Sequence, residues 1–168
     1  ATSFPGDYNA WTLDLSKGGG VFFTNAVYCI EYIEYVLGKP ISEYFGMRLK
    51  SEEFGGDKEC TLNFKIGNDT LATSKISGYV KLLNKLFIYG SEGYIEMDNF
   101  YKADKMTIHY YDDRDNEEVY HPATCEMTYE INHFNSCIIE GKLTSDVITK
   151  EMTIHNVEIL ENIQNSWK

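Results

Sequence analysis

The sequence predicts an α+β fold in which an open, mainly antiparallel β-sheet carries helices packed on one face. Three observations predict this class: a long apolar helix comes early in the chain, the segment 41–111 consists of short runs bounded by turn residues, and two helical segments follow. Runs of strands followed by runs of helices are typical of α+β proteins. The length of 168 residues is that of one domain, so residues 1–168 are expected to form a single domain.

The first long helix is predicted over residues 18–37. It begins with three consecutive glycines, and it ends before a glycine and a proline that stop helices. Thr24, Tyr28 and Tyr32 recur every four residues, so they are expected to share one stripe of the helix. The side chains expected to face the core on another stripe are those of Phe22, Phe23, Ala26, Val27, Ile30, Ile33 and Leu37.

Five to seven antiparallel strands are predicted between residues 41 and 111, because glycine-rich turn sequences recur there. Residues 61–66 alternate between polar and apolar side chains, which predicts a strand with one face in water. Residues 86–89 are apolar on both sides of their predicted strand. We therefore expect this sheet face to pair with another subunit, in a homodimer or a higher oligomer.

The end of the chain is predicted to contain an acidic loop and two helices. Residues 112–118 lack the glycine that a calcium-binding loop needs, so they are expected to form a solvated loop. The helices are predicted over residues 126–140 and 149–167, with Thr149 capping the second. The apolar seam of the last helix is expected to consist of Ile154, Val157, Leu160 and Ile163.

Composition argues against several classes of partner. The formal net charge of −11 repels phosphate groups, so neither nucleic acid nor a membrane surface is expected as a partner. The four cysteines show no CxxC spacing, and the amino terminus does not resemble a signal peptide. These features indicate a reducing cytoplasm and buried, inert thiols. The chain begins at Ala1 without an initiator methionine, as an excised fragment would.

Three segments occur in an order and spacing found in a known family. The first reads YNAWTLDLSKGGGVFFTNAVYCIEYIEYVLGKP, the second reads YGSEGYIE from Tyr89, and the third is the predicted helix from Tyr129 to Gly141. Together they resemble the second domain of the Gfo/Idh/MocA oxidoreductases, the family of glucose-fructose oxidoreductase and inositol dehydrogenase. The run Val27–Ile30 and the helix that carries His133 are most similar to the dihydrodiol dehydrogenase branch.

The resemblance implies the C-terminal fold of that family, which is glyceraldehyde-phosphate-dehydrogenase-like. It also implies an NAD(P)-dependent dehydrogenase of a sugar, polyol or dihydrodiol-like hydroxyl, whose N-terminal Rossmann domain binds the cofactor. The triple glycine at 18–20 lacks the GxGxxG spacing of a dinucleotide site, so we expect the N-terminal domain to be absent from this chain. NAD or NADP would then be bound mainly by that domain in the full-length protein, and the isolated chain is expected to bind no cofactor and to be inactive.

Site residues are implied on the helix that follows the glycines. The family carries an aspartate there and, four residues later, a histidine or tyrosine beside the reacting carbon; Thr24 and Tyr28 occupy these positions. Tyr28 is the candidate catalytic group, because a tyrosine can accept a proton when a nearby cation lowers its pKa from about 10. Thr24, Trp11 and His133 are the candidate substrate-binding residues.

Alternatives remain open at these positions. Gly19 and Gly20 are expected beside the cofactor, although a tight helix start packed against backbone would explain them equally. Tyr28 could instead be a core tyrosine with a satisfied hydroxyl. Thr24 cannot ionise, so it does not replace the family's carboxylate. A non-catalytic ligand-binding or oligomerisation domain of the same fold is therefore the alternative, and a free-standing ligand-binding domain is a third.

No metal site is expected from the histidines. His133 and Cys137 are four residues apart on one predicted helix with Glu130 on nearly the same face, but a zinc site needs three well-placed ligands and an open position. His109 is predicted in a strand without an identifiable partner. His155 is expected to be exposed on the last helix.

Overall fold

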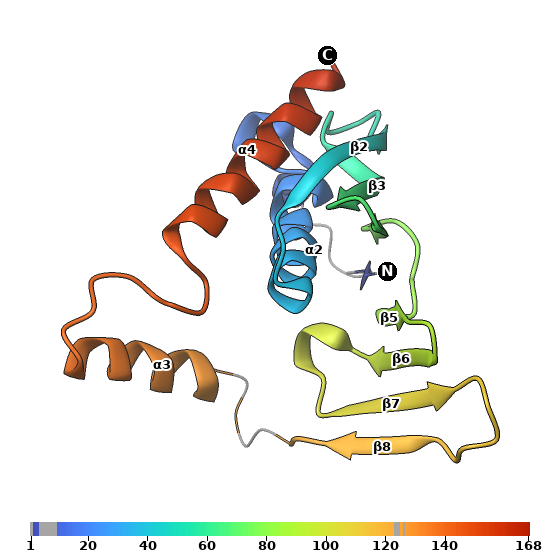
Figure 1. Cartoon of the computed structure of the whole chain (residues 1–168). Helices are drawn as coiled ribbons and strands as arrows, with labels where there is room; N and C mark the ends of the chain where they lie inside the picture. Colours follow the sequence, from blue (N-terminus) through green and yellow to red (C-terminus); the bar gives the residue numbers. More distant parts are fainter. Residues whose placement is uncertain (1, 4–9, 123–124, 126) are drawn as a thin grey trace. The chain divides into compact units, whose positions relative to one another are not determined.

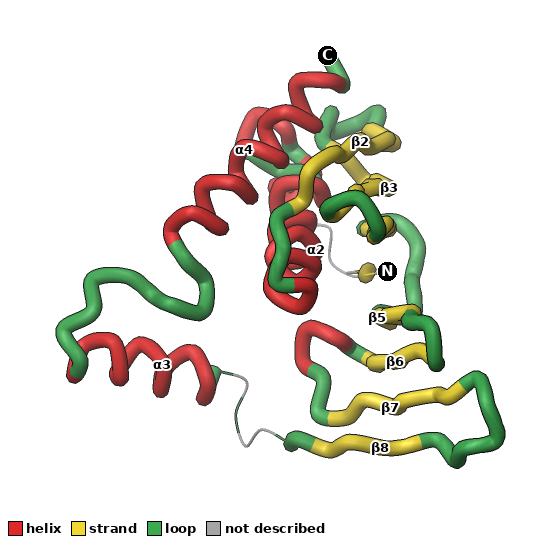
Figure 2. The backbone as a smooth tube through the Cα atoms, in the orientation of Figure 1, coloured by secondary structure: helices red, strands yellow, loops and turns green. Residues whose placement is uncertain are grey.

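The structure is a computed structural model of the whole chain, which describes residues 2–3, 10–122, 125 and 127–168, with side chains from Thr12 onward (Figures 1 and 2). The chain divides into two compact units. The helix unit comprises Thr2–Leu82 and Thr144–Lys168, and the strand unit comprises Leu83–Leu143. The mixture of antiparallel sheets and helices confirms the predicted α+β class.

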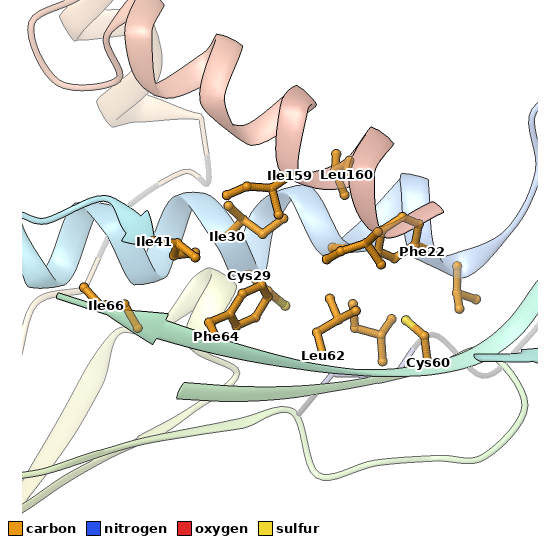
Figure 3. Packing of buried hydrophobic residues seen from close by; sticks show 14 of the residues in the cluster. Phe22, Cys29, Ile30, Ile41, Cys60, Leu62, Phe64, Ile66, Ile159 and Leu160 are labelled. Atoms are coloured by element: carbon orange, nitrogen blue, oxygen red, sulfur yellow. The ribbon is translucent and has the colours of Figure 1, made fainter. Parts of the chain in front are cut away.

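The helix unit holds one four-stranded sheet and the two long helices. Its strands lie in the order β1, β4, β3, β2; the last three pair antiparallel, and β1 joins β4 in parallel. Helices α2 and α4 pack on each other and against one face of this sheet (Figure 3). The elements are β1 (Thr2–Ser3), α1 (Ala10–Leu13), a 3-10 helix (Leu15–Lys17), α2 (Val21–Leu37), β2 (Ile41–Lys50), β3 (Asp57–Ile66), β4 (Thr70–Ser77) and α4 (Lys150–Ser166).

Helix α2 forms the centre of the hydrophobic core, as its spacing predicted. Gly38 follows the helix in the left-handed conformation and ends it, since its N–H donates to the Glu34 carbonyl. Phe23 is the exception among the predicted core residues, because it lies on the exposed side of the helix. The side chains that fill the core with α2 residues Phe22, Ala26 and Ile30 are those of Leu62, Phe64, Ile66, Ile159, Leu160 and Ile163 (Figure 3).

The predicted seam of α4 is half wrong. Leu160 and Ile163 are buried, but Ile154 and Val157 are exposed. The seam instead continues through Asn156, which is buried because its Nδ2 donates to the Val27 carbonyl of α2 at 3.2 Å. A polar residue at a core position cannot be found from an apolar pattern. Thr149 caps the helix as predicted, accepting a bond from the Met152 N–H at 3.2 Å.

The strand unit forms a second four-stranded sheet, where the sequence predicted a single open sheet. Its strands follow chain order and are all antiparallel. Glu117 and Glu118 belong to the edge strand and not to the acidic loop, because they pair with Ile108 and Thr107 on the neighbouring strand. Glu118 also forms an ion pair with Lys105. The elements are β5 (Lys85–Tyr89), β6 (Gly93–Asp98), a 3-10 helix (Phe100–Lys102), β7 (Lys105–Tyr110), β8 (Glu117–Tyr120) and α3 (Thr128–Ile139).

The described helices include none that combines the length and the apolar composition needed to cross a membrane.

Candidate active site

The loop Gly18–Gly20 leads into α2 and is held by backbone hydrogen bonds. Gly18 is left-handed with a φ of 76°, and Gly20 has a φ of 133° that side chains rarely adopt. The Gly19 N–H donates to the Asp14 carbonyl at 2.9 Å, and the Gly20 N–H donates to the Thr12 carbonyl at 2.7 Å. Both N–H groups are therefore engaged by the chain's own backbone.

The turn between β2 and β3 is hydrogen-bonded to the segment that precedes this loop. The Leu15 N–H donates to the Phe54 carbonyl at 3.1 Å, and the Gly56 N–H donates to the Leu13 carbonyl at 2.9 Å. A Cβ atom at Gly56 would lie 2.1 Å from the Leu13 carbonyl oxygen, so glycine is required there. The segment that leads into α2 is thus held by a turn about 40 residues further along the chain.

A buried ion pair lies beside the start of α2. Arg48 Nη1 is 2.8 Å from Asp57 Oδ1, and the two side chains are only 10% and 5% exposed. A Cβ atom at Gly20 would lie 2.9 Å from Asp57 Oδ2, so this carboxylate packs directly against the helix start, where the helix dipole favours a negative charge. Arg48 also lies over the Trp167 ring, 4.9 Å from its centroid. No spacing rule in the sequence indicates this pair.

Thr24 and Tyr28 lie one turn apart on the solvent side of α2. The Thr24 hydroxyl donates to the Gly20 carbonyl at 2.9 Å and accepts from Asn25 Nδ2 at 2.8 Å. Tyr28 is 59% exposed, which contradicts the alternative of a core tyrosine. Within the described part of the chain, its hydroxyl has no hydrogen-bond partner. Tyr32 continues the stripe, and partial burial raises the pKa of its phenol.

The other predicted site residues come from several elements of the chain. Trp11 lies in α1, and its side chain is outside the described part of the structure. Gly19 and Gly20 are buried. His133 lies on α3 of the strand unit, with its Nε2 3.6 Å from Cys137 Sγ. No group of three or more His, Cys, Asp or Glu residues that could hold a metal ion occurs among the described residues.

The expectation of buried thiols holds for two cysteines. Cys29 and Cys60 are buried, and burial raises the pKa of both thiols, which keeps them protonated and unreactive. Cys137 is half-buried. The expectation is wrong for Cys125, which is exposed.

A second buried acidic group lies at the far end of α2. Glu34 is 5% exposed and accepts the Ile41 N–H at 2.8 Å. His155 Nδ1 also lies 2.8 Å from Glu34 Oε1. The prediction of an exposed His155 was therefore wrong, because this histidine bridges α4 to α2 through a partner 121 residues away in sequence.

The strand unit carries a polar hollow of about 650 Å³ on one face of its sheet. Lys85 donates to Glu96 and lies 3.2 Å from Asp98 Oδ1, and its hydrogen bond lowers the pKa of Glu96. His109 Nε2 is 3.2 Å from Glu96 Oε2, although the two atoms are not aligned as a hydrogen bond, and its ring stacks on Tyr94. His109, for which the sequence suggested no partner, thus belongs to a charged group on this face.

The loop Gly18–Gly20 does not fit the pyrophosphate of a dinucleotide. Such a site needs free N–H groups at a helix start directly after a strand. Here a 3-10 helix precedes the loop, and the N–H groups of Gly19 and Gly20 are already bonded. The Asp57 side chain also occupies the space beside Gly20, where a Cβ atom would lie 2.9 Å from its Oδ2. The described residues therefore offer no dinucleotide cradle at the start of α2.

A family model for the GFO/IDH/MocA C-terminal domain matches residues 1–96. The chain belongs to this family. The matched region contains the loop Gly18–Gly20, the whole of α2 and the buried pair Arg48–Asp57. A comparison with curated protein sequences finds no significant match.

Solved structures of oxidoreductases share the fold of this GFO/IDH/MocA domain. A 3-ketoreductase from Actinomadura kijaniata, in complex with NADP and TDP-benzene, superposes with a TM-score of 0.82 at 15% identity, over 97% of this chain and 51% of that chain. The aldose-aldose oxidoreductase from Caulobacter crescentus, in complex with glycerol, gives a TM-score of 0.79 at 16% identity, over 97% and 50%.

A levoglucosan dehydrogenase in complex with NADH and levoglucosan gives a TM-score of 0.73 at 16% identity, over 97% of this chain and 55% of that chain. Identities this low establish the fold alone. The chain spans about half the length of the solved structures that it matches.

Proposed function

We propose that this domain is the substrate-side half of an NAD(P)-dependent oxidoreductase that acts on a hydroxyl group of a sugar, polyol or dihydrodiol-like molecule. The observation that carries the proposal is the exposed Tyr28, one turn beyond Thr24 on a helix whose start is fixed by buried contacts. Two solved structures of the same fold, an aldose-aldose oxidoreductase and a levoglucosan dehydrogenase, support this substrate class. The cofactor would be held by an N-terminal Rossmann domain of the full-length protein, because the loop Gly18–Gly20 does not fit a pyrophosphate.

Tyr28 would accept the hydroxyl proton of the substrate while the hydride on the same carbon passes to the nicotinamide. This role requires a nearby cation that lowers the pKa of the phenol, and that cation would come from the other domain. Thr24 already donates its hydroxyl hydrogen to Gly20, so it can accept a hydrogen bond from the substrate but cannot take its proton. Trp11 and His133 stay predicted substrate-binding residues.

A non-catalytic ligand-binding or oligomerisation domain of the same fold is the second candidate. Thr24 favours it, because the family places a carboxylate at this position. Turnover of the full-length protein with NAD and NADP over a panel of sugars, polyols and dihydrodiols separates the two. The dehydrogenase proposal requires turnover on at least one substrate. Ligand binding without turnover on any substrate would establish the second candidate instead.

We also propose that the chain forms a homodimer or a higher oligomer through its open sheet faces. On β2, the side chains of Phe45, Met47 and Leu49 are exposed. Their partners on β3 are polar residues that alternate with the buried ones, so all of them face away from the core. In the strand unit, Phe87 and Tyr89 are likewise exposed on one face of β5. Apolar side chains that are exposed together on one sheet face of a single chain are typical of a surface that another subunit covers.

Replacing Met47 with lysine is expected to weaken this association by about tenfold to a hundredfold, because a charge would be buried in an apolar interface. Met47 is 67% exposed in the single chain, so the fold should tolerate the change. Light scattering over a concentration series measures the effect. The control is Leu143→Lys, at a fully exposed loop residue that belongs to neither sheet. A wild-type chain that stays monomeric at high concentration would contradict the proposal.

A further inference from the structure

A pocket of about 450 Å³ lies between the carboxyl end of α2 and the first turns of α4. All of its lining residues belong to the helix unit. Its apolar walls are formed by Tyr35, Pro40, Val147 and Met152. A volume of this size suits a small organic molecule, which is usually oriented in such a pocket by a few polar groups.

Carboxylates outnumber cations around this pocket. Glu34 is a buried lining residue that accepts the Ile41 N–H and lies 2.8 Å from His155 Nδ1. Asp146 and Glu151 also line the pocket and are exposed. Lys39 is the one lysine or arginine among the described lining residues, and its Nζ lies 3.7 Å from the carboxylate of Asp69.

The carboxyl end of α2 adds a partial negative charge to this pocket. Helix α2 ends at the pocket with no basic residue in its last turn, so the partial negative charge of its terminal carbonyls is not countered within the helix. The amino end of α4 also lies there, but it is countered by the Thr149 cap and by Glu151 in its first turn. The half-exposed ring of Tyr35 offers a face on which a cation can lie.

We propose that this pocket binds a small organic ammonium ion with an apolar body. The ammonium group lies near the carboxylate of Glu151 and the carboxyl end of α2, and the body packs against Tyr35, Val147 and Met152. Glu34 is ten residues beyond Thr24 on α2, a rise of about 15 Å along the helix at 1.5 Å per residue. Tyr28 is closer to Glu34, at a rise of about 9 Å for six residues, and neither Thr24 nor Tyr28 lines the pocket. The pocket therefore does not depend on the proposed dehydrogenase function.

Calorimetric titration of the 168-residue chain with phenethylammonium chloride tests the proposal. Phenethyl alcohol is the neutral control of similar shape, and hydrocinnamate is the anionic one. The ammonium ion is expected to bind at least about tenfold more tightly than either control. Amide chemical shifts in the NMR spectrum should then move chiefly at residues 34–40 and 146–155.

Glu151→Gln is expected to weaken ammonium binding about fivefold to tenfold, because one exposed carboxylate is lost. Glu158→Gln removes an exposed carboxylate of the same helix outside the pocket, and it should leave binding unchanged. Thermal unfolding of both variants checks that the fold is intact. Equal binding of the alcohol, preference for the anion, shifts elsewhere in the chain, or no saturable binding up to about 10 mM would overturn the proposal. Equal weakening by the two variants would overturn it as well.

Discussion

Replacing Tyr28 with phenylalanine in the full-length protein is expected to lower kcat for hydroxyl oxidation by about a hundredfold to ten-thousandfold. The change removes only the phenol oxygen that would accept the substrate proton, and it keeps the ring. The side chain is largely exposed and has no hydrogen-bond partner in the described part of the chain, so folding should not be affected. KM should change little, because the proton is transferred in the transition state and not on binding. Initial rates of NAD(P)H formation give both constants.

Tyr35→Phe is the matched control for this experiment. Tyr35 is a similarly exposed tyrosine on the same helix, about 10 Å further along it at 1.5 Å per residue. The kcat of the Tyr35→Phe variant should stay within about twofold of wild type, because the Tyr35 hydroxyl would not contact the reacting carbon. A Tyr28→Phe variant that retains wild-type kcat would show that Tyr28 does not carry the proton.

Replacing Asp57 with alanine is expected to lower the free energy of unfolding of the chain by about 3–5 kcal/mol. The change leaves the buried Arg48 guanidinium without its counter-charge and removes the carboxylate that packs against Gly20. Urea denaturation of the chain measures the loss.

An exposed ion pair provides the control for that measurement. Glu43 lies 2.5 Å from Lys65 on the same sheet, but both side chains are open to solvent. Glu43→Ala should therefore cost only about 0–1 kcal/mol. If Asp57→Ala costs no more than Glu43→Ala, the buried pair does not fix the start of α2.

Local patterns in the sequence predicted the elements well. Helix α2 ends at Leu37 before Gly38 as expected, and the alternation at residues 61–66 places Leu62, Phe64 and Ile66 in the core. Each of these features depends on a few consecutive residues, so spacing rules can predict it. The division of the strands into two sheets could not be found in this way, because strand pairing depends on contacts between distant segments.

Within the candidate site, only the residues that the family resemblance indicated were predicted from the sequence. Thr24 and Tyr28 were indicated by their positions after the glycines, and the structure places both on the exposed side of α2. The pairs Arg48–Asp57 and Glu34–His155 were missed. Their members lie on different elements, and neither the charge nor the polarity of one residue identifies a partner that folding brings to it.

The proposed dependence of this domain on a separate cofactor-binding domain can be tested by calorimetric titration of NADH and NADPH. The 168-residue chain and the full-length protein would be compared under the same conditions, with dehydrogenase activity assayed in parallel. We expect the full-length protein to bind at least one of the two cofactors, and the isolated chain to bind neither and to show no activity. Saturable cofactor binding or NADH formation by the isolated chain would contradict this dependence.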